Sequence, residues 1–207
     1  MVQKAYNEWS ATYDSDINLT RDLDHVATVN SLKGLPSQRI LEIGCGTGKN
    51  TAYLAQICEK MLALDFSEGM LAIARKKLNM NNLAFVLADI TRPWPCRDQD
   101  MDLIISNLVL EHVEYLPFVF SEAYRSLKAG GSFFVCELHP FRQYQGKKAR
   151  FQADEETIEI QAYIHHISSF IDAAKDTGFK LRELKEWWHE KDEDTAAPRL
   201  ISFIFGK

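Results

Sequence analysis

The residues best suited to chemistry lie in one short segment, residues 40–50, which reads Ile-Leu-Glu-Ile-Gly-Cys-Gly-Thr-Gly-Lys-Asn. Its apolar start predicts a buried strand, which leads directly into Gly44, Gly46 and Gly48. Small and apolar residues then recur at helical spacing from Ala52. A glycine-rich turn from a strand into a helix lets a ligand approach the backbone, and it directs free helix N–H groups toward that ligand. The segment therefore predicts a site for a nucleotide-like cofactor.

The spacing of these glycines argues against a cofactor held by its phosphates. The dinucleotide fingerprint has the form G-x-G-x-x-G, and Lys49 stands where its third glycine would fall. A phosphate loop of the form G-x-x-x-x-G-K-[ST] is also excluded. Gly48 and Lys49 are followed by Asn50, and no glycine stands five residues before Gly48. A cofactor with a ribose but no phosphate is therefore favoured.

Two acidic residues end the next predicted strands. Residues 61–65 predict a second strand that ends in Asp65, and residues 83–89 a third that ends in Asp89. A carboxylate at the tip of the second strand of a βαβ unit can accept hydrogen bonds from two ribose hydroxyls. The two acids thus strengthen the prediction of a nucleoside site.

With these features the sequence resembles the class I S-adenosylmethionine-dependent methyltransferases, in particular their small-molecule, type 11-like branch. Their first motif has the form Glu42-x-Gly44-x-Gly46-x-Gly48, and a Leu-Lys-x-Gly-Gly turn, here residues 127–131, is another of their features. The resemblance implies an α/β fold, a Rossmann-like doubly wound seven-stranded sheet that is mostly parallel and has a C-terminal antiparallel strand. It also implies S-adenosyl-L-methionine as cofactor and S-adenosyl-L-homocysteine as product.

The resemblance further implies roles for individual residues. Asp89 would accept a hydrogen bond from the adenine amine, and Ile90 would pack on the adenine ring. Glu42 would steer the amine or amide end of the methionine moiety, although a buried acid with a role in stability is an alternative. Tyr13 would lie over the methionine part or serve as a core anchor. The complete set of predicted cofactor-binding residues is Tyr13, Glu42, Gly44, Cys45, Gly46, Gly48, Asp65, Phe66, Met70, Ala88, Asp89, Ile90, Asn107 and Leu108.

Residues 101–107 and 132–138 predict the fourth and fifth strands. Candidate residues for the methyl acceptor follow these two strands. His139 comes at the end of the fifth strand, where open α/β sheets bind ligands, and its side chain could act as a base near neutral pH. His112 lies in a predicted helix after the fourth strand and has either a structural or a substrate-contacting role. Arg142 and Tyr144 could bind an acidic or phenolic acceptor, or they belong to a solvated loop.

The whole chain, residues 1–207, is expected to form a single methyltransferase domain, because 207 residues with 46% hydrophobic content suit one core. Within it, residues 1–36 predict a helical cap segment with several aromatic residues. The strand–helix alternation stops at about residue 138, and residues 139–165 predict an inserted β-hairpin, whose second strand is predicted over residues 157–165. These two segments are expected to cover the acceptor pocket.

The composition of the chain excludes several classes of binding partner. A net charge of −5 argues against a nucleic-acid acceptor, and the absence of an 18-residue apolar run argues against a membrane span. The first residues lack the apolar core of a signal peptide, which predicts a cytoplasmic protein. The four cysteines form no C-x-x-C pair, so reduced thiols are expected. The only close pair of histidines, His165 and His166, would have diverging side chains, so no structural metal site is expected. The predicted state is a monomer or homodimer with a small-molecule partner.

The predicted reaction is an in-line transfer of the methyl group to an oxygen or nitrogen atom of a small molecule. Three alternatives stay open: a nucleic-acid or protein methyltransferase, a non-catalytic binding protein, and an NAD(P)-dependent oxidoreductase. Amino-group methyltransferases of the first kind often carry two prolines and an aromatic residue after an Asn or Asp. Here Asn107 is followed by Leu-Val-Leu instead.

Overall fold

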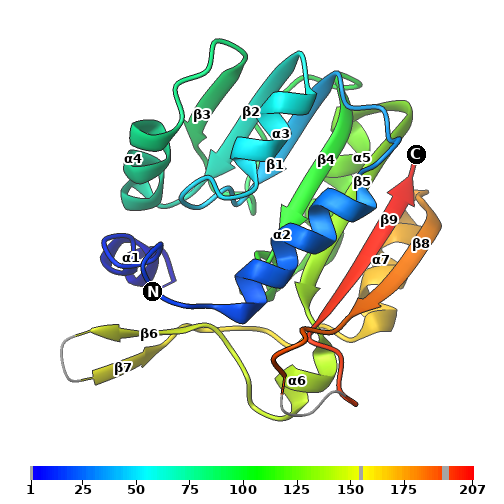
Figure 1. The fold of residues 1–207 in the computed structure, drawn as a ribbon. Coiled ribbons are helices and arrows are strands. Elements are labelled where there is room, and N and C mark those ends of the chain that lie inside the picture. The colour runs from blue at the N-terminus through cyan, green and yellow to red at the C-terminus, as the bar shows by residue number, and fades with distance from the viewer. Residues whose placement is uncertain (1, 154–155, 193–195) are drawn as a thin grey trace.

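The computed structural model describes residues 2–153, 156–192 and 196–207 (Figure 1). A seven-stranded sheet runs through it in the order β3-β2-β1-β4-β5-β9-β8. Its strands are β1 (Arg39–Ile43), β2 (Lys60–Asp65), β3 (Leu83–Leu87), β4 (Met101–Asn107), β5 (Leu127–Leu138), β8 (Lys180–Trp187) and β9 (Leu200–Gly206). Neighbouring strands from β3 to β5 pair in parallel, whereas β9 is antiparallel to both β5 and β8. The predicted α/β fold is confirmed.

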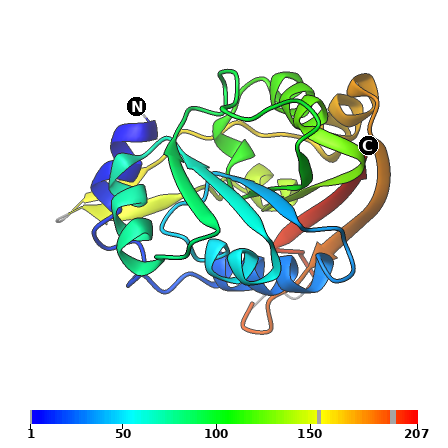
Figure 2. The same cartoon turned by 90° about the horizontal axis from the view of Figure 1, so that it is seen from above.

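Helices cover both faces of this sheet, as a mostly parallel sheet requires (Figure 2). They are α2 (Leu19–Ser31), α3 (Thr51–Ile57), α4 (Glu68–Lys77), α5 (Leu116–Ser126) and α7 (Ile167–Thr177). Alternate residues of β1 supply the two cores: Ile40 packs with α2 and α3, whereas Leu41 and Ile43 pack with α5 and α7. This period of two follows from the pleat of a strand.

The order of the strands determines where a ligand can bind. The chain winds outward from β1 through β2 to β3, then returns to place β4 on the other side of β1. At such a switch point the connections leave β1 and β4 in opposite directions, which opens a crevice at their carboxyl ends. Gly44 directly follows β1, and Asn107 ends β4. Two of the predicted cofactor residues, Gly44 and Asn107, therefore lie at the crevice that the strand order creates.

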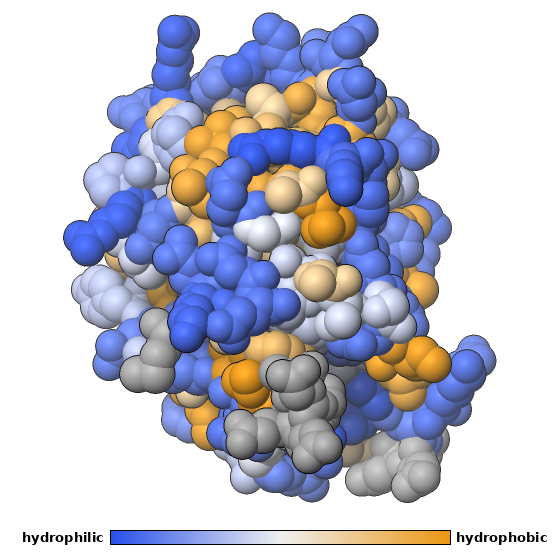
Figure 3. Space-filling model, turned by 90° about the vertical axis from the view of Figure 1, so that its left-hand side faces the viewer, coloured by the Kyte–Doolittle hydropathy of each residue, from blue (hydrophilic) through white to orange (hydrophobic). Residues whose placement is uncertain are grey.

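Two segments outside the sheet pack against each other beside this crevice. The first is α1 (Val2–Trp9), and the second is the hairpin of β6 (Arg150–Ala153) and β7 (Glu156–Glu159). The Trp9 ring stacks on Phe151 with a centroid distance of 5.3 Å, and Ile160 completes this small third core. On the face that carries α1 and α4, hydrophobic residues form separate patches among hydrophilic ones (Figure 3).

Some predicted boundaries were wrong. The predicted strand over residues 157–165 ends at Glu159, because Ile160 turns into the core around Trp9. The fifth strand begins at Leu127 rather than Ser132, since Leu127 already pairs with Met101 across a register shift. A short helix, α6 (Pro140–Tyr144), precedes the hairpin. Within the described ranges, no helix combines the length and the apolar character needed to cross a membrane.

Candidate functional site

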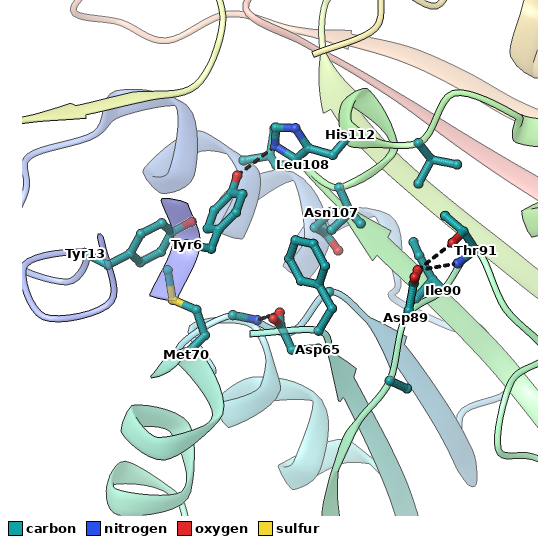
Figure 4. A pocket seen from close by; sticks show the side chains of 16 residues that line it. Tyr6, Tyr13, Asp65, Met70, Asp89, Ile90, Thr91, Asn107, Leu108 and His112 are labelled. Carbon is teal, nitrogen blue, oxygen red and sulfur yellow. Dashed lines mark hydrogen bonds between the residues drawn. The ribbon is translucent and has the colours of Figure 1, made fainter. Parts of the chain in front are cut away.

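A pocket, here called the inner pocket, lies at the carboxyl ends of β1, β2 and β4 (Figure 4). Its polar groups come from the strand ends and the turns that follow them, and its outer wall comes from α1 and the segment after it. Its lining consists of Tyr6, Tyr13, Gly44, Gly46, Asp65, Phe66, Met70, Ala88, Asp89, Ile90, Thr91, Asn107, Leu108, Val109, His112 and Val113. Most of the predicted cofactor residues are thus brought together.

The glycine turn has a left-handed backbone at each of its three glycines. Gly44 has φ 72°, and a Cβ there would lie 2.1 Å from a methyl carbon of Val109. Packing therefore excludes a side chain at Gly44. Gly48 has φ 86°, which strains any residue with a side chain, and its Cβ would lie 2.8 Å from the end of the Leu78 side chain. Gly46 differs, because nothing lies within 4 Å of the place of its Cβ. Since Gly46 lines the inner pocket, the free space beside it is available to a ligand.

Asp65 is held at the centre of this turn. One carboxylate oxygen accepts from the backbone N–H of Gly46 at 2.8 Å, and the other accepts from Ser67 N–H at 2.8 Å. Burial raises the pKa of Asp65, and the hydrogen bonds from Ser67 and Gly46 oppose that shift. Each oxygen keeps a second lone pair. The side chain can therefore accept two further hydrogen bonds, as a vicinal diol would donate.

The opposite wall carries Asp89. Its Oδ1 accepts from the N–H and the hydroxyl of Thr91 at 2.9 and 2.7 Å, which fixes the carboxylate. Its Oδ2 has no hydrogen-bond partner in the part of the chain that the structure describes. Figure 4 shows Tyr13 and Met70 across the pocket from Asp89 and Ile90. A flat ring with an amino group could therefore lie between an apolar wall and a free carboxylate oxygen.

A second cavity, here called the acidic cavity, adjoins the inner pocket and shares Tyr13, Gly44, Gly46, Asn107 and Leu108 with it. The predicted residues Glu42 and Cys45 also line it. Gly48 lines neither space and packs against α4 instead. The predicted cofactor residues therefore divide between two connected cavities and one packing position.

Buried carboxylates dominate the acidic cavity. Glu42 accepts from the Thr51 hydroxyl, and burial raises its pKa to about 8. Asp24 accepts from the side-chain amides of Asn50 and Asn107, and burial raises its pKa too. No described Lys or Arg forms an ion pair with either acid. Two buried acids without a cation suit a positively charged group in the cavity.

One residue of the acidic cavity, Asp24, was missed from the sequence, and the predicted residue Asn107 has a feature that the sequence did not indicate. Asp24 lies on the face of α2 that also buries Ala27 and Thr28. An acid on the apolar face of a helix was the available signal. Asn107 contributes a side-chain oxygen that is buried and lacks a hydrogen-bond partner among the described residues. Such an orphaned acceptor fits a ligand that donates a hydrogen bond.

His112 connects three segments at the edge of the inner pocket. Its Nδ1 lies 2.8 Å from the carbonyl of Gln161, and its Nε2 lies 2.8 Å from the Tyr6 hydroxyl. Because a carbonyl only accepts, Nδ1 carries the proton and neutral Nε2 accepts from Tyr6. Burial lowers the pKa of His112, which favours the neutral ring. The sequence drew attention to the aromatic N-terminal segment but did not place Tyr6 in this pair.

The element around His112 differs from the predicted helix. It is a single 3₁₀ turn, η1 (Leu110–His112). Leu108 has φ 55°, and the buried carboxylate of Glu137 accepts from the N–H groups of Val109 and Leu110 at 3.0 and 2.9 Å. The carboxylate thereby satisfies the free N–H groups at the start of a turn that does not continue as an α-helix.

Two other predicted residues lie away from the inner pocket. His139 caps α6 by accepting from Phe141 N–H, and its other ring nitrogen lies 3.0 Å from Glu186. The hydroxyl of Tyr144 lies 2.7 Å from His166. Neither residue lines the inner pocket or the larger groove beside it. The positions of His139 and Tyr144 therefore do not support the predicted contacts with an acceptor.

The larger groove, here called the outer groove, has a volume of about 730 Å³. It shares Tyr6, Tyr13 and Leu108 with the inner pocket, so the two spaces meet at these side chains. Its remaining walls come from Trp9 and the loop before α2, the first turn of α2, residues of η1, β5 and α6, the hairpin with the residues just before it, and Arg199, which directly precedes β9. The predicted residue Arg142 lines this groove. In residues 2–153, 156–192 and 196–207, no group of three or more His, Cys, Asp or Glu could hold a metal ion.

Comparison with known proteins identifies the family. Residues 41–135 match the family model described as a methyltransferase domain. The chain is 32% identical over 168 residues to malonyl-[acyl-carrier protein] O-methyltransferase of Bacillus anthracis, covering 78% of this chain and 61% of that protein. The chain belongs to the class I S-adenosylmethionine-dependent methyltransferases. The cofactor of this family is S-adenosylmethionine.

Other relatives agree on the family and the fold. The chain is 30% identical over 208 residues to the biotin biosynthesis bifunctional protein BioHC of Saccharophagus degradans, covering 95% of this chain but 36% of that protein. A possible histamine N-methyltransferase from Thermotoga maritima has the same fold, with a TM-score of 0.74, 20% identity and 99% coverage of both chains. The chain thus spans about three fifths or less of these curated relatives, 61% and 36%.

Proposed function

We propose that this protein transfers the methyl group of S-adenosylmethionine to an oxygen or nitrogen atom of a small-molecule acceptor. The observation that carries the proposal is the junction of two spaces with different linings. The inner pocket has the polar groups that suit the cofactor, and it opens past Tyr6, Tyr13 and Leu108 into the outer groove. A donor and an acceptor can therefore meet at this junction.

The inner pocket and the acidic cavity would hold the cofactor. Asp65 would accept from the ribose hydroxyls, and Asp89 would accept from the adenine amine through its free oxygen. The unpaired oxygen of Asn107, with Glu42 and Asp24, would receive the amino group of the methionine moiety. The match between these acids and the positive charges of the cofactor supports the assignment.

Methyl transfer from this cofactor requires little from the protein beyond the correct placement of the two reactants. The sulfonium of the bound cofactor supplies an activated methyl group. The residues of this chain would align the acceptor with that group and exclude water, which are two large sources of rate. The pair of Tyr6 and His112 lies at the junction, where the neutral ring nitrogen fixes the direction of the Tyr6 hydroxyl. We therefore assign Tyr6 a role in orienting the acceptor.

The names of the relatives do not choose one acceptor. Several are malonyl-[acyl-carrier protein] O-methyltransferases. A demethylmenaquinone methyltransferase of Clavibacter sepedonicus is equally similar, with 33% identity over 141 residues. Relatives of similar identity thus act on different acceptors. The properties of the outer groove must decide between acceptor classes.

Calorimetric titration tests the cofactor first. We expect binding of S-adenosylmethionine and S-adenosylhomocysteine, no binding of NAD, NADP or ATP, and at least tenfold weaker binding to Asp65→Ala, about 1.4 kcal/mol. Binding of NAD or NADP in preference to the sulfur nucleotides would refute the proposal. A screen for methyl transfer from the labelled cofactor then tests the activity itself.

The role of the hairpin has a separate test. Replacing residues 150–159 with a short Gly-Ser linker removes Phe151 from its stack on Trp9 and opens the outer groove. We expect the cofactor affinity to persist and methyl transfer to disappear. A large loss of cofactor affinity would instead show that the hairpin supports the inner pocket.

A further inference from the structure

The outer groove has a charge opposite to that of the whole chain. The protein has a net charge of −5. Cations nevertheless outnumber acids in the groove lining, because it includes Arg21, Arg142, Lys147, Lys148, Arg150 and Arg199 but only Asp16 and Glu111 as acids. Two carboxylates outside the lining, Asp192 and Glu159, pair with some of these cations. A positive excess remains after both are counted.

Three of the cations already have partners that hold the walls together. Arg142 and Arg199 both bind the carboxylate of Asp192, and Arg142 also donates to the backbone carbonyls of Ala197 and Pro198. Lys148 pairs with Glu159 across the base of the hairpin. These structural contacts account for three of the six cations, so no bound ligand is needed to explain them.

The other three cations lack such a partner. Arg21 donates to the carbonyls of Tyr13 and Asp16, and its guanidinium lies 4.0 Å from the centre of the Tyr13 ring. Lys147 and Arg150 are exposed and form no ion pair with any residue that the structure describes. Three cations from two separate segments thus line one groove without a carboxylate of their own.

The two acids of the lining do not cancel this excess. Asp16 accepts from the indole N–H of Trp9 at 2.7 Å, and its single charge leaves the cations of the lining in excess. Glu111 is buried, and burial raises its pKa to about 7. Its carboxyl group therefore carries only part of a negative charge at neutral pH. Apolar surface from Trp9 and Phe151 lies in the same groove.

We propose that the methyl acceptor is an anion: a small molecule with a carboxylate or phosphate group that Lys147, Arg150 and Arg21 bind in the outer groove. This inference rests on the proposed function and names the chemical class of its acceptor. The charged group binds toward the base of the hairpin, and the less polar part of the molecule packs against Trp9 and Phe151. The accepting atom then reaches the junction at Tyr6 and Leu108.

Binding to the protein saturated with S-adenosylhomocysteine tests the proposal. The probes are matched pairs with and without a negative charge, titrated by calorimetry. Malonyl and acetyl thioesters of N-acetylcysteamine test a carboxylate, and glycerol 3-phosphate and glycerol test a phosphate. We expect the charged member of at least one pair to bind tenfold or more tightly than the neutral member. The pair that responds identifies the source of the anion.

Two double variants place the binding site. Lys147→Ala/Arg150→Ala should weaken binding of the charged probe at least tenfold and leave the affinity for S-adenosylhomocysteine unchanged. The matched control is Lys60→Ala/Arg97→Ala, which removes the same two types of exposed cation outside all three cavities. This control should bind both ligands like the unmodified protein.

The outcomes separate the two proposals. Equal binding of charged and neutral probes, binding of no probe, or equal losses in the two double variants would overturn the anionic acceptor. Failure of the proposed function appears earlier, as the absence of binding of S-adenosylhomocysteine itself. Cofactor binding without anion selectivity would thus refute this inference alone.

Discussion

The inner pocket with its acidic cavity and the outer groove meet at the same side chains, yet buried acids line the first and exposed cations line the second. Buried acids face the space for the cofactor, with Asp24, Glu42 and Asp65 unpaired with any described cation. Exposed cations face the neighbouring groove. A cationic group of the cofactor would favour ionisation of these acids, whereas an anionic acceptor would be attracted by the exposed cations. The difference indicates that electrostatics can sort two ligands that must come within a few ångströms of each other.

The two regions also differ in how the chain builds them. The inner pocket uses strand ends and the turns directly after them, and backbone hydrogen bonds fix its acids. The outer groove uses segments that are far apart in sequence, namely α1 and its following loop, α6, the hairpin and Arg199 just before β9. We therefore expect substitutions in the inner pocket and the acidic cavity to change the affinity for the cofactor. Substitutions in the outer groove should change the affinity for the acceptor.

The largest effect is expected at Gly46. A Cβ there meets no protein atom within 4 Å and enters the space beside the inner pocket. We predict that Gly46→Ala weakens binding of S-adenosylhomocysteine about a hundredfold, about 2.8 kcal/mol. Gly34→Ala is the matched control, because Gly34 also has a positive φ and open space but lies outside the cavities.

Both glycine variants should lose about 1–2 kcal/mol of unfolding free energy from backbone strain. Thermal unfolding measures that shared cost, and calorimetry measures the affinity. Equal affinities of the two variants would show that the open space at Gly46 has no part in cofactor binding.

Smaller losses of cofactor affinity are expected from substitutions of Asp65 and Asp89, and the two losses should differ. Both oxygens of Asp65 accept from backbone N–H groups, so an amide nitrogen in Asp65→Asn would oppose one of these donors. We predict at least a tenfold loss of cofactor affinity. Asp89→Asn keeps the oxygen that accepts from Thr91 and changes only the free one, so we expect a loss of about threefold. A loss at Asp89 as large as that at Asp65 would contradict this order.

The sequence indicated which residues of the inner pocket and the acidic cavity lie close together, because its signals there are local. Glu42, the glycines and Asp65 lie within one strand–turn–helix–strand unit, where spacing fixes position. Even there, Asp24 was missed, because its role depends on how α2 packs across the end of β4. Its contact with Asn107 joins residues that are 83 positions apart. Periodicity indicates that a helix has a buried face but not which strand it meets.

The acceptor side was less predictable for the same reason. His139 has a suitable chemistry and a suitable strand end, yet its ring caps α6 and pairs with Glu186 on β8. That pairing depends on β9 entering the sheet between β5 and β8, which leaves the His139 ring outside the groove. The basic cluster from Arg142 to Arg150 was visible in the sequence. Its position opposite Arg21 depends on the stack of Trp9 on Phe151.

The pH dependence of cofactor affinity should follow the ionisation of Glu42 in the acidic cavity. Burial raises the pKa of Glu42 to about 8 in the free protein, so the side chain is mostly protonated between pH 5.5 and 7.5. A bound ammonium group favours the ionised form, and binding therefore releases protons. We predict that the affinity for S-adenosylhomocysteine rises about threefold per pH unit over this range. Glu42→Gln should remove the slope, and a flat profile in the unmodified protein would refute the linkage.

A modest effect is expected from salt, and it compares the acidic cavity and the outer groove directly. The Debye length is about 10 Å at 0.1 M ionic strength, and screening acts mainly on exposed charges. Lys147 and Arg150 are exposed, whereas Asp24, Glu42 and Asp65 are buried. Raising the salt from about 0.05 to 0.3 M should therefore weaken binding of an anionic probe about two- to fivefold. Over the same range, the affinity for S-adenosylhomocysteine should change less than twofold. Equal salt dependence of the two ligands would mean that the outer cations do not bind the probe, because only their charges are accessible to the added ions.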